Sequence, residues 1–174
     1  MNEPPTFRTP RLILRPRTLA DIEACLAMDD DAEVMRFLGV RWTDAESHRI
    51  FVEARTRHSY PPGMGYWSAF LEQTFIGWIL LTPLDLLGPE IEIGWRFVRR
   101  AWRRGYATEA ARPILAHALQ TLGLSEVVAD IMPANAASVG VARKLGMRLA
   151  GPAVHAGYDV SRFIAGRFDA PAGG

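Results

Sequence analysis

The residues with the clearest chemical potential form a short basic loop, Arg103-Arg104-Gly105, directly before a helix-forming stretch that begins near Ala107. An apolar run, Ile91 to Val98, precedes the loop, so this order predicts a strand, a turn and then a helix. A turn that opens a helix leaves several backbone N–H groups unpaired and pointing in one direction. Together with the helix dipole and two guanidinium groups, these donors predict a site for a phosphate or pyrophosphate.

The kind of phosphorylated ligand is narrowed by motifs that the sequence does not contain. There is no G-x-x-x-x-G-K-S/T, which excludes a P-loop, and no G-x-G-x-x-G, which excludes the dinucleotide fingerprint. The pattern that is present is x-x-G-x-A, from Arg103 to Ala107. Taken alone, this pattern is equally consistent with a purely structural turn between a strand and a helix.

The loop resembles motif A of the GNAT acyltransferases, the acetyl-CoA-dependent superfamily, whose usual pattern is Q/R-x-x-G-x-G/A. Trp102 departs from that pattern because it occupies the Gln/Arg position. The longer sequence W-x-x-G-Y-A-T-E-A resembles the loop of the acetyltransferases that modify the N-termini of ribosomal proteins. Further segments resemble that branch in the same order, over roughly residues 6 to 152: Thr9–Pro16, Asp31–Leu38, Glu92–Trp95, Asn135–Ser138 and Lys144–Met147.

This resemblance implies an α+β fold: a GNAT-like mixed, mostly antiparallel central sheet flanked by helices, in a single domain over residues 1–174. The last twenty or so residues match poorly, and 169–174 are expected to form a loose tail. The implied activity is acetyl-CoA-dependent transfer of an acetyl group to a primary amine, by direct attack in a ternary complex. The acceptor is left open between a protein N-terminus, an antibiotic, a polyamine and a small metabolite amine. Because the family often forms dimers, a homodimer is a further expectation.

The resemblance also implies how acetyl-CoA is held at its pyrophosphate. The backbone amides around Gly105 would form a cradle, and a side chain at Gly105 would block close approach of the phosphate. Arg103 and Arg104 would supply positive charge, although a solvated position is nearly as consistent with Arg104.

The pantetheine arm would lie like an extra strand beside Phe97 and Val98, in a gap between two central strands. Its thiol end would be lined by the start of the following helix. The cofactor-binding residues implied in this way are Phe97, Val98, Arg103, Arg104, Gly105, Tyr106, Ala107, Thr108, Asn135 and Ser138.

Two residues are the candidates for catalysis. Glu92 is the expected general base, and Glu90 shares its face of the strand two residues away; an edge carboxylate paired with an arginine, or a water acting as base, is the alternative. Ser138 resembles the family serine that serves the leaving thiolate, where it would donate a hydrogen bond or position water. Tyr158 is a second candidate donor. The oxyanion would be stabilised by a backbone N–H near residues 95–97, worth roughly 3–4 kcal/mol.

The required strength of the base depends on the amine. A lysine-like amine with a pKa near ~10.4 is neutral in about one molecule per two thousand at pH 7, a penalty of roughly 4–5 kcal/mol. An α-amine with a pKa of about 7.7–8.0 loses only roughly 1 kcal/mol. A site for peptide N-termini therefore needs only a weak base, whereas a site for lysine or polyamines needs a strong one.

Selection of the acceptor is expected to fall to residues before and within the first hairpin, where aromatic and flexible side chains could wall a pocket: Met35, Trp42, Tyr66 and Trp67. Aromatic residues are more often core than pocket, so about half of these are expected to contribute. The four histidines occur in scattered contexts without metal-ligand spacing and are expected to be ordinary: His48, His58, His117 and His155.

Composition sets the remaining bounds. A chain of 174 residues with 49% hydrophobic and 22% charged residues is an ordinary single domain, and a net charge of +1 gives no reason to expect nucleic acid or a membrane surface as partner. Cys25 is the sole cysteine, so no disulfide or cysteine-based metal cluster can form, and no metal is expected. No signal peptide is apparent, and the longest apolar stretch, Phe75 to Leu81, is too short to cross a bilayer, so a cytoplasmic location is expected.

A non-catalytic acyl-CoA-binding module and a structural interaction protein without a ligand are the alternative functions.

The expected elements follow from periodicity and breakers. Pro113 conflicts with the expected helix 107–122 because proline removes a backbone hydrogen bond. The helices are expected at 18–30, from Thr43-Asp44 through Ala54, at 107–122 and at 136–145, and the strands at 11–15, 66–71, 75–81, 90–98, 127–132 and 158–164.

Overall fold

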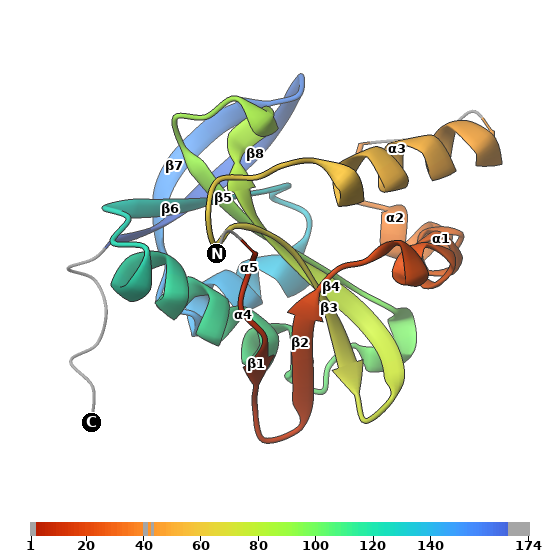
Figure 1. Ribbon diagram of the computed structural model, residues 1–174. Coiled ribbons are helices and arrows are strands. Elements are labelled where there is room, and N and C mark those ends of the chain that lie inside the picture. The colour runs from red at the N-terminus through yellow and green to blue at the C-terminus, as the bar shows by residue number, and fades with distance from the viewer. Residues whose placement is uncertain (1–2, 40–41, 43, 167–174) are drawn as a thin grey trace.

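The fold is built around one sheet of eight strands, in the order β1-β2-β3-β4-β5-β6-β8-β7 (Figure 1). The computed structural model describes residues 3–39, 42 and 44–166. All neighbouring strands pair antiparallel except β5 and β6, which are parallel. This confirms the expected mixed, mostly antiparallel sheet. The strands are β1 (Phe7–Arg8), β2 (Leu12–Pro16), β3 (Gly65–Leu71), β4 (Thr74–Pro83), β5 (Ile91–Phe97), β6 (Glu126–Ile131), β7 (Arg148–His155) and β8 (Tyr158–Gly166).

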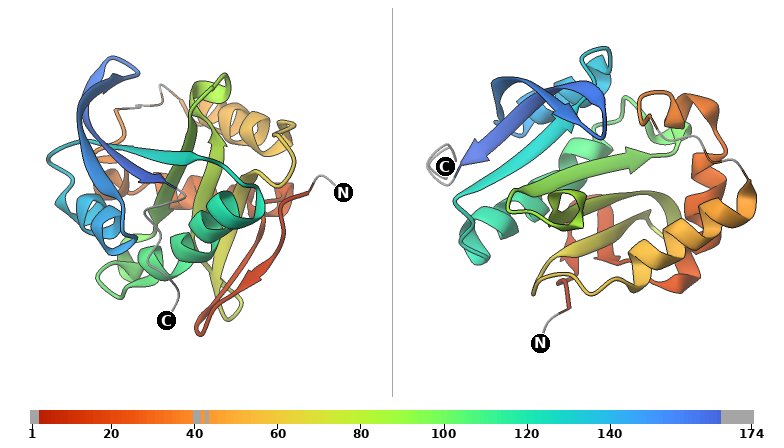
Figure 2. Two further views of the ribbon diagram at one scale, coloured as in Figure 1. Left: turned by 90° about the vertical axis from the view of Figure 1, so that its left-hand side faces the viewer. Right: turned by 90° about the horizontal axis from the view of Figure 1, so that it is seen from above.

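Helices cover both faces of the sheet (Figures 1 and 2). On one face lie α1, α2 and α3, and on the other lie α4 and α5. No helix in the described part of the chain has the length and apolar character to cross a membrane. The α-helices are α1 (Ile22–Asp29), α2 (Ala32–Met35), α3 (Ala45–Arg57), α4 (Tyr106–Ala116) and α5 (Ala136–Lys144), and the short helical turns are η1 (Leu19–Asp21), η2 (Leu84–Leu86), η3 (Arg99–Ala101) and the π-helical η4 (His117–Thr121).

The sheet buries apolar residues on both of its faces because both faces are covered. In β4, Ile79 and Leu81 belong to the large core that packs against α4. Trp78, directly before Ile79, points to the opposite face and belongs to a smaller core with α1. The strand therefore reads as a nearly continuous apolar run rather than as an alternating one.

The sheet is interrupted at its centre, between β5 and β6. Among the described residues these two strands pair at a single position, Glu92 with Val128. On the other side of β5 the ladder with β4 is long, and the Val98 N–H donates to the Ile76 carbonyl at 3.0 Å. Because N–H directions alternate along a strand, the N–H groups of residues 95 and 97 turn toward the β6 side, past the point where β6 is paired. The expected gap between these two strands therefore has a structural basis.

Most of the expected elements are present, and two differences have clear physical causes. The strand β7 was not expected because Gly151 and Pro152 interrupt its sequence; a register shift next to Gly151 and a position at the sheet edge accommodate both residues. The helix α4 continues through Pro113, then changes to the π-helical turn η4 and ends at Gly123 with a φ of 68°. Thr43 and the tail 169–174 lie outside the described residues, and α3 starts after an N-cap at Asp44.

Candidate active site

The turn that precedes α4 has the backbone geometry of an anion site. Arg103 and Gly105 adopt left-handed conformations, with φ of 59° and 78°, on either side of Arg104. Alternation of handedness along successive residues turns their N–H groups toward one side, which forms a concave nest for anions. A Cβ at Gly105 would meet only Arg11 Nη2, at 3.5 Å, so the need for glycine there comes from the positive φ rather than from crowding.

The first turn of α4 adds further donors to this nest. Its first helical bond is from Glu109 N–H to the Gly105 carbonyl, at 3.0 Å, so the amides of Tyr106, Ala107 and Thr108 have no helical partner. Arg103 and Arg104 are exposed and form no ion pair within the described part of the chain. The turn therefore has both expected features, free backbone N–H donors and two unpaired positive charges among the described residues.

This turn is fixed from behind by the start of the chain. Glu109 accepts hydrogen bonds from the Thr9 hydroxyl at 2.6 Å and from Arg11 Nε at 2.7 Å. The Arg11 guanidinium also lies 4.4 Å from the centre of the Tyr106 ring, and the Tyr106 side chain is buried. The Tyr106 side chain is therefore part of the core, and its backbone amide is the group that could face a ligand.

The edge of β5 beside the gap offers fewer backbone groups than expected. The Phe97 carbonyl already accepts a hydrogen bond from Trp102 Nε1 at 2.8 Å, and the Val98 N–H is used by β4. The Phe97 N–H remains on the gap side. Trp102, which departs from the family pattern, therefore covers part of the edge on which the pantetheine arm is expected.

Across the gap, the start of α5 brings the other expected residues into place. Asn135 is the N-cap of α5, and its side chain accepts from the Ser138 N–H at 3.2 Å. The Ser138 hydroxyl accepts a hydrogen bond from Trp95 Nε1 at 3.3 Å, which joins α5 to β5. Asn135 thus orients Ser138 through the backbone, and the Ser138 hydroxyl is in direct contact with a side chain of β5.

On the opposite face of the sheet, a cavity of about 210 Å³ lies between α1, α3 and the strands β3 to β5. Its walls combine aromatic and aliphatic side chains with several charged groups. Glu92 faces this cavity. The lining residues are Arg17, Cys25, Asp29, Met35, Trp42, Phe51, Val52, Arg55, Tyr66, Trp78, Leu80, Thr82, Pro83, Asp85, Glu92, Arg96 and His155.

Among the titratable groups that line this cavity, Glu92 has a strongly shifted pKa. Burial raises its pKa from 4.5 to about 7, and the carboxylates of Asp130 and Asp85 add to the increase, whereas His155 and Arg55 oppose it. A carboxyl group with this pKa changes its charge close to neutral pH, which is the property of a general base.

His155 connects Glu92 to a set of acidic side chains. Its Nε2 lies 2.9 Å from Asp85 Oδ1, and its Nδ1 lies 3.3 Å from Asp130 Oδ2. Burial lowers the pKa of His155, but the hydrogen bond with Asp85 and the charges of Glu92, Asp85 and Asp130 outweigh it and raise the pKa. Arg162 in turn holds Asp130 by two hydrogen bonds, of 2.8 and 2.7 Å.

Of the four residues expected to wall the acceptor pocket, three line the cavity and one does not. Met35, Trp42 and Tyr66 line the cavity. Trp67 does not: it is fully buried on the other face, and its Nε1 donates to the Pro5 carbonyl at 2.7 Å. Neighbouring residues in a strand point to opposite faces, so Tyr66 and Trp67 could not both contribute.

Four further residues have contacts that the sequence did not indicate. The Tyr158 hydroxyl donates to the Gly39 carbonyl at 2.8 Å, and Tyr158 is not among the residues that line the cavity. His155 was expected to be ordinary, yet it lies beside Glu92. Arg17 and Arg55 were not singled out at all, since nothing in their sequence neighbourhoods signals that helices and strands bring them to one cavity.

The split sheet, the donor-rich turn before α4 and the cavity with carboxyl groups form the arrangement expected of an acyltransferase that uses a phosphorylated acyl carrier. The chain belongs to the GNAT acetyltransferase family: residues 11–148 match the family described as acetyltransferase (GNAT) domain. This membership confirms, at the level of the family, an acyltransferase with acetyl-CoA as cosubstrate.

Individual relatives agree with the family assignment. The chain is 32% identical over 152 residues to the FsC-acetyl coenzyme A-N(2)-transacetylase of Aspergillus fumigatus; the match covers 82% of this chain and 65% of that protein's length. A GNAT-family acetyltransferase from Bacillus anthracis has a similar structure, with a TM-score of 0.80, 25% identity and coverage of 94% of this chain and 99% of that one.

The branch within the family is less closely defined. RimL, a ribosomal L7/L12 α-N-protein acetyltransferase solved in complex with coenzyme A, shares the fold with a TM-score of 0.75 over 93% of this chain and 98% of its own. At 16% identity this likeness concerns the fold alone. The resemblance to the ribosomal-protein branch therefore stays a prediction.

Proposed function

We propose that this protein is an acetyl-CoA-dependent N-acetyltransferase in which Glu92 accepts the proton of the acceptor amine. The observation that carries this proposal is a carboxyl group with a pKa of about 7, facing a cavity and belonging to the strand whose far edge borders the gap in the sheet. Acetyl-CoA supplies the acetyl thioester. The residues of this chain bind it, orient it and move the proton.

The cofactor-binding residues of this proposal are those that the backbone geometry fits. The amides from Arg103 to Thr108, with the charges of Arg103 and Arg104, hold the pyrophosphate. The alternating φ of this turn and the lack of acidic partners for both arginines among the described residues support that role. The Phe97 N–H and Val98 contribute to the pantetheine end, beside Asn135 and Ser138.

The proton transfer follows from the strength of the base. A pKa of about 7 makes Glu92 a stronger base than a glutamate at its ordinary 4.5, and it remains about half ionised at pH 7. The neutral amine forms the new C–N bond, Glu92 takes the amine proton, and the thiolate leaves toward Ser138, whose hydroxyl can donate a hydrogen bond. The Trp95 N–H, which also turns toward the gap, stabilises the oxyanion. A side chain of this kind favours catalysis over a module that only binds acyl-CoA.

Two measurements test the proposal. Calorimetry should show binding of acetyl-CoA, and an amine panel should show acceptor-dependent release of free thiol together with an N-acetylated product by mass spectrometry. Binding without transfer to any amine would support the acyl-CoA-binding module instead. No binding of acetyl-CoA would refute both.

A further inference from the structure

The cavity that holds Glu92 contains a group of hydrogen-bond donors without acceptors. Within the described residues, four buried side-chain atoms have no hydrogen-bond partner: Nε and Nη2 of Arg17, Nε1 of Trp42 and Nε of Arg96. All three residues line the same cavity. All four atoms are N–H donors, and none is an acceptor. Because buried polar groups are normally satisfied, this set points to a ligand that brings oxygen acceptors into the cavity.

Arg17 is the centre of this set. It is 9% exposed, and no acidic side chain among the described residues lies within ion-pair distance of it. Its guanidinium lies 3.8 Å from the centre of the Tyr66 ring, which supports the charge from one side only. A buried guanidinium without an anion is costly, and a carboxylate is a small anion whose geometry matches its planar donors.

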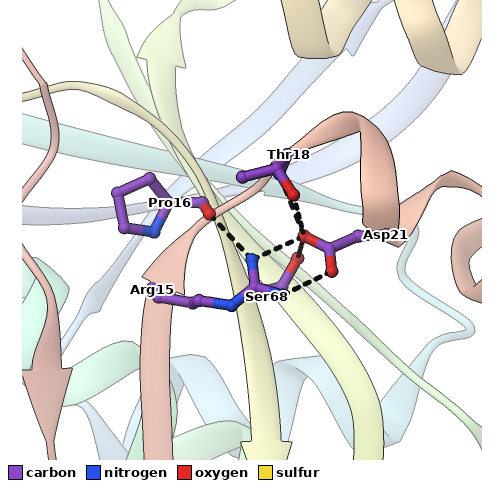
Figure 3. Close-up of polar contacts among 5 residues, drawn as sticks. All are labelled: Arg15, Pro16, Thr18, Asp21 and Ser68. Atoms are coloured by element: carbon purple, nitrogen blue, oxygen red, sulfur yellow. Dashed lines mark hydrogen bonds and ion pairs between the residues drawn. The ribbon is translucent and has the colours of Figure 1, made fainter.

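The residues on both sides of Arg17 are fixed by a network around Asp21, which Figure 3 shows for Arg15, Thr18 and Ser68. Arg15, before it, forms two hydrogen bonds with Asp21 at 2.8 and 2.7 Å, and the Thr18 N–H, after it, donates to Asp21 at 2.9 Å. Ser68 on β3 also donates to Asp21 at 2.9 Å. The Arg17 N–H itself donates to the Tyr66 carbonyl at 2.8 Å.

The other charged side chains of the cavity indicate where the anionic group and the amine of a ligand would lie. Arg96 is paired with Asp29 at 2.8 Å, and His155 with Asp85 at 2.9 Å. These pairs leave two guanidinium groups, Arg17 and Arg55, and one carboxyl group, Glu92, without an ion-pair partner in the described chain. A ligand that complements them carries an anionic group for the arginines and an amine for Glu92.

We propose that the acceptor is a small amino acid or amino-acid derivative, whose carboxylate is bound by Arg17 while its amine faces Glu92. The assignment rests on the proposed N-acetyltransferase function. A cavity of about 210 Å³ is smaller than the range of roughly 300–1,000 Å³ that holds drug-sized ligands, which agrees with a small acceptor. A polyamine, which would bring two or more positive charges next to unpaired arginines, is disfavoured by the same charges.

The test compares acceptors that differ only in the carboxylate. For each of several side chains, kcat/KM is measured for the amino acid, its carboxamide and its decarboxylated amine, with spermidine as the polyamine and acetyl-CoA at saturation. Loss of one hydrogen-bonded charge pair should lower kcat/KM by about 10- to 100-fold. The wild-type protein should prefer at least one free amino acid over its carboxamide and amine by that factor.

Variants connect the preference to Arg17. Arg17→Gln should lower kcat/KM for the amino acid by about 10- to 100-fold, mainly through KM, and change it less than threefold for the decarboxylated amine. Arg17→Lys keeps the positive charge but lacks the two parallel N–H donors of the guanidinium group. It should therefore recover part of the lost kcat/KM. The control is Arg57→Gln, an exposed arginine at the end of α3 that does not line the cavity. Calorimetry with acetyl-CoA and the melting temperature verify that each variant is folded.

Thermal stabilisation by unreacted amino acids in the presence of coenzyme A gives a readout that needs no turnover. Stabilisation that Arg17→Gln abolishes supports the assignment. If the wild type binds acetyl-CoA but neither turnover nor stabilisation depends on the carboxylate, or if Arg17→Gln keeps the full preference, the assignment is overturned while the proposed function stands. If acetyl-CoA itself does not bind, the proposed function fails.

Discussion

Replacing Glu92 by glutamine removes a cavity carboxyl group whose charge changes near neutral pH. In the wild type, a pKa of about 7 leaves about one-tenth of Glu92 ionised at pH 6, half at pH 7 and nine-tenths at pH 8. Since the ionised form is the base, the contribution of Glu92 to kcat should increase about tenfold per pH unit below pH 7 and level off above it.

The size of the loss follows from the role assigned to the carboxylate. General-base catalysis contributes roughly 10²- to 10⁴-fold, so Glu92→Gln should lower kcat by about two orders of magnitude or more at pH 8. The remaining activity should depend on deprotonation of the amine alone, which moves the pH profile upward. Affinity for acetyl-CoA should not change, because Glu92 lies on the cavity side of β5.

The assay is a pH series of thiol release from pH 5.5 to 9 at saturating acetyl-CoA, with cofactor affinity measured by calorimetry. Glu90→Gln is the matched control: Glu90 is two residues away, its side chain is 42% exposed, and it forms an ion pair with Arg162 at 3.6 Å. Turnover of Glu92→Gln within twofold of the wild type, with the step near pH 7 retained, would refute the reasoning and leave a water as the base.

Three further predictions concern the turn, the scaffold and the base. Gly105→Glu should weaken coenzyme A binding in calorimetry by more than 100-fold, whereas Gly123→Glu, with a similar φ of 68° and open space around it, should cost comparable backbone strain of about 1–2 kcal/mol and leave binding intact; equal loss in both would argue against the turn. Asp21→Asn should lower the free energy of unfolding at pH 7 by about 2–3 kcal/mol in urea titrations, because its hydrogen bonds with an arginine and Ser68 weaken. Burial raises the pKa of Asp21, but these bonds outweigh it and lower the pKa below 3.8, so the difference should be present above that pH and disappear below it; a difference that persists in acid would contradict this. His155→Asn should raise the kinetic pKa of Glu92, because His155 lowers it by its charge, and a profile that does not move would remove His155 from the base's surroundings.

The parts of the site that were predictable from the sequence are those encoded by neighbouring residues. A positive φ at Gly105 and the free amides after it follow from a strand, a glycine turn and a helix in succession. Glu92 could be placed on a strand face by simple alternation. The same alternation, applied to Tyr66 and Trp67, would have excluded one of them from the pocket.

The parts that were not predictable depend on contacts between distant segments. His155 is 63 positions from Glu92, and Arg17 is 75 from it, so no local pattern could show that they share a cavity. The strand β7 was hidden because Gly151 and Pro152 are breakers in isolation and become acceptable only at the edge of a sheet. Such residues acquire their roles when the tertiary structure forms.

The single pairing position between β5 and β6 divides the sheet into a block of five strands and a block of three. Under the proposed function, a cosubstrate that lies between them supplies the hydrogen bonds missing from that seam and ties the two blocks together. Binding then stabilises the folded state by mass action. The supply of cosubstrate would in this way set how long each molecule resists proteolysis, in addition to how fast it works.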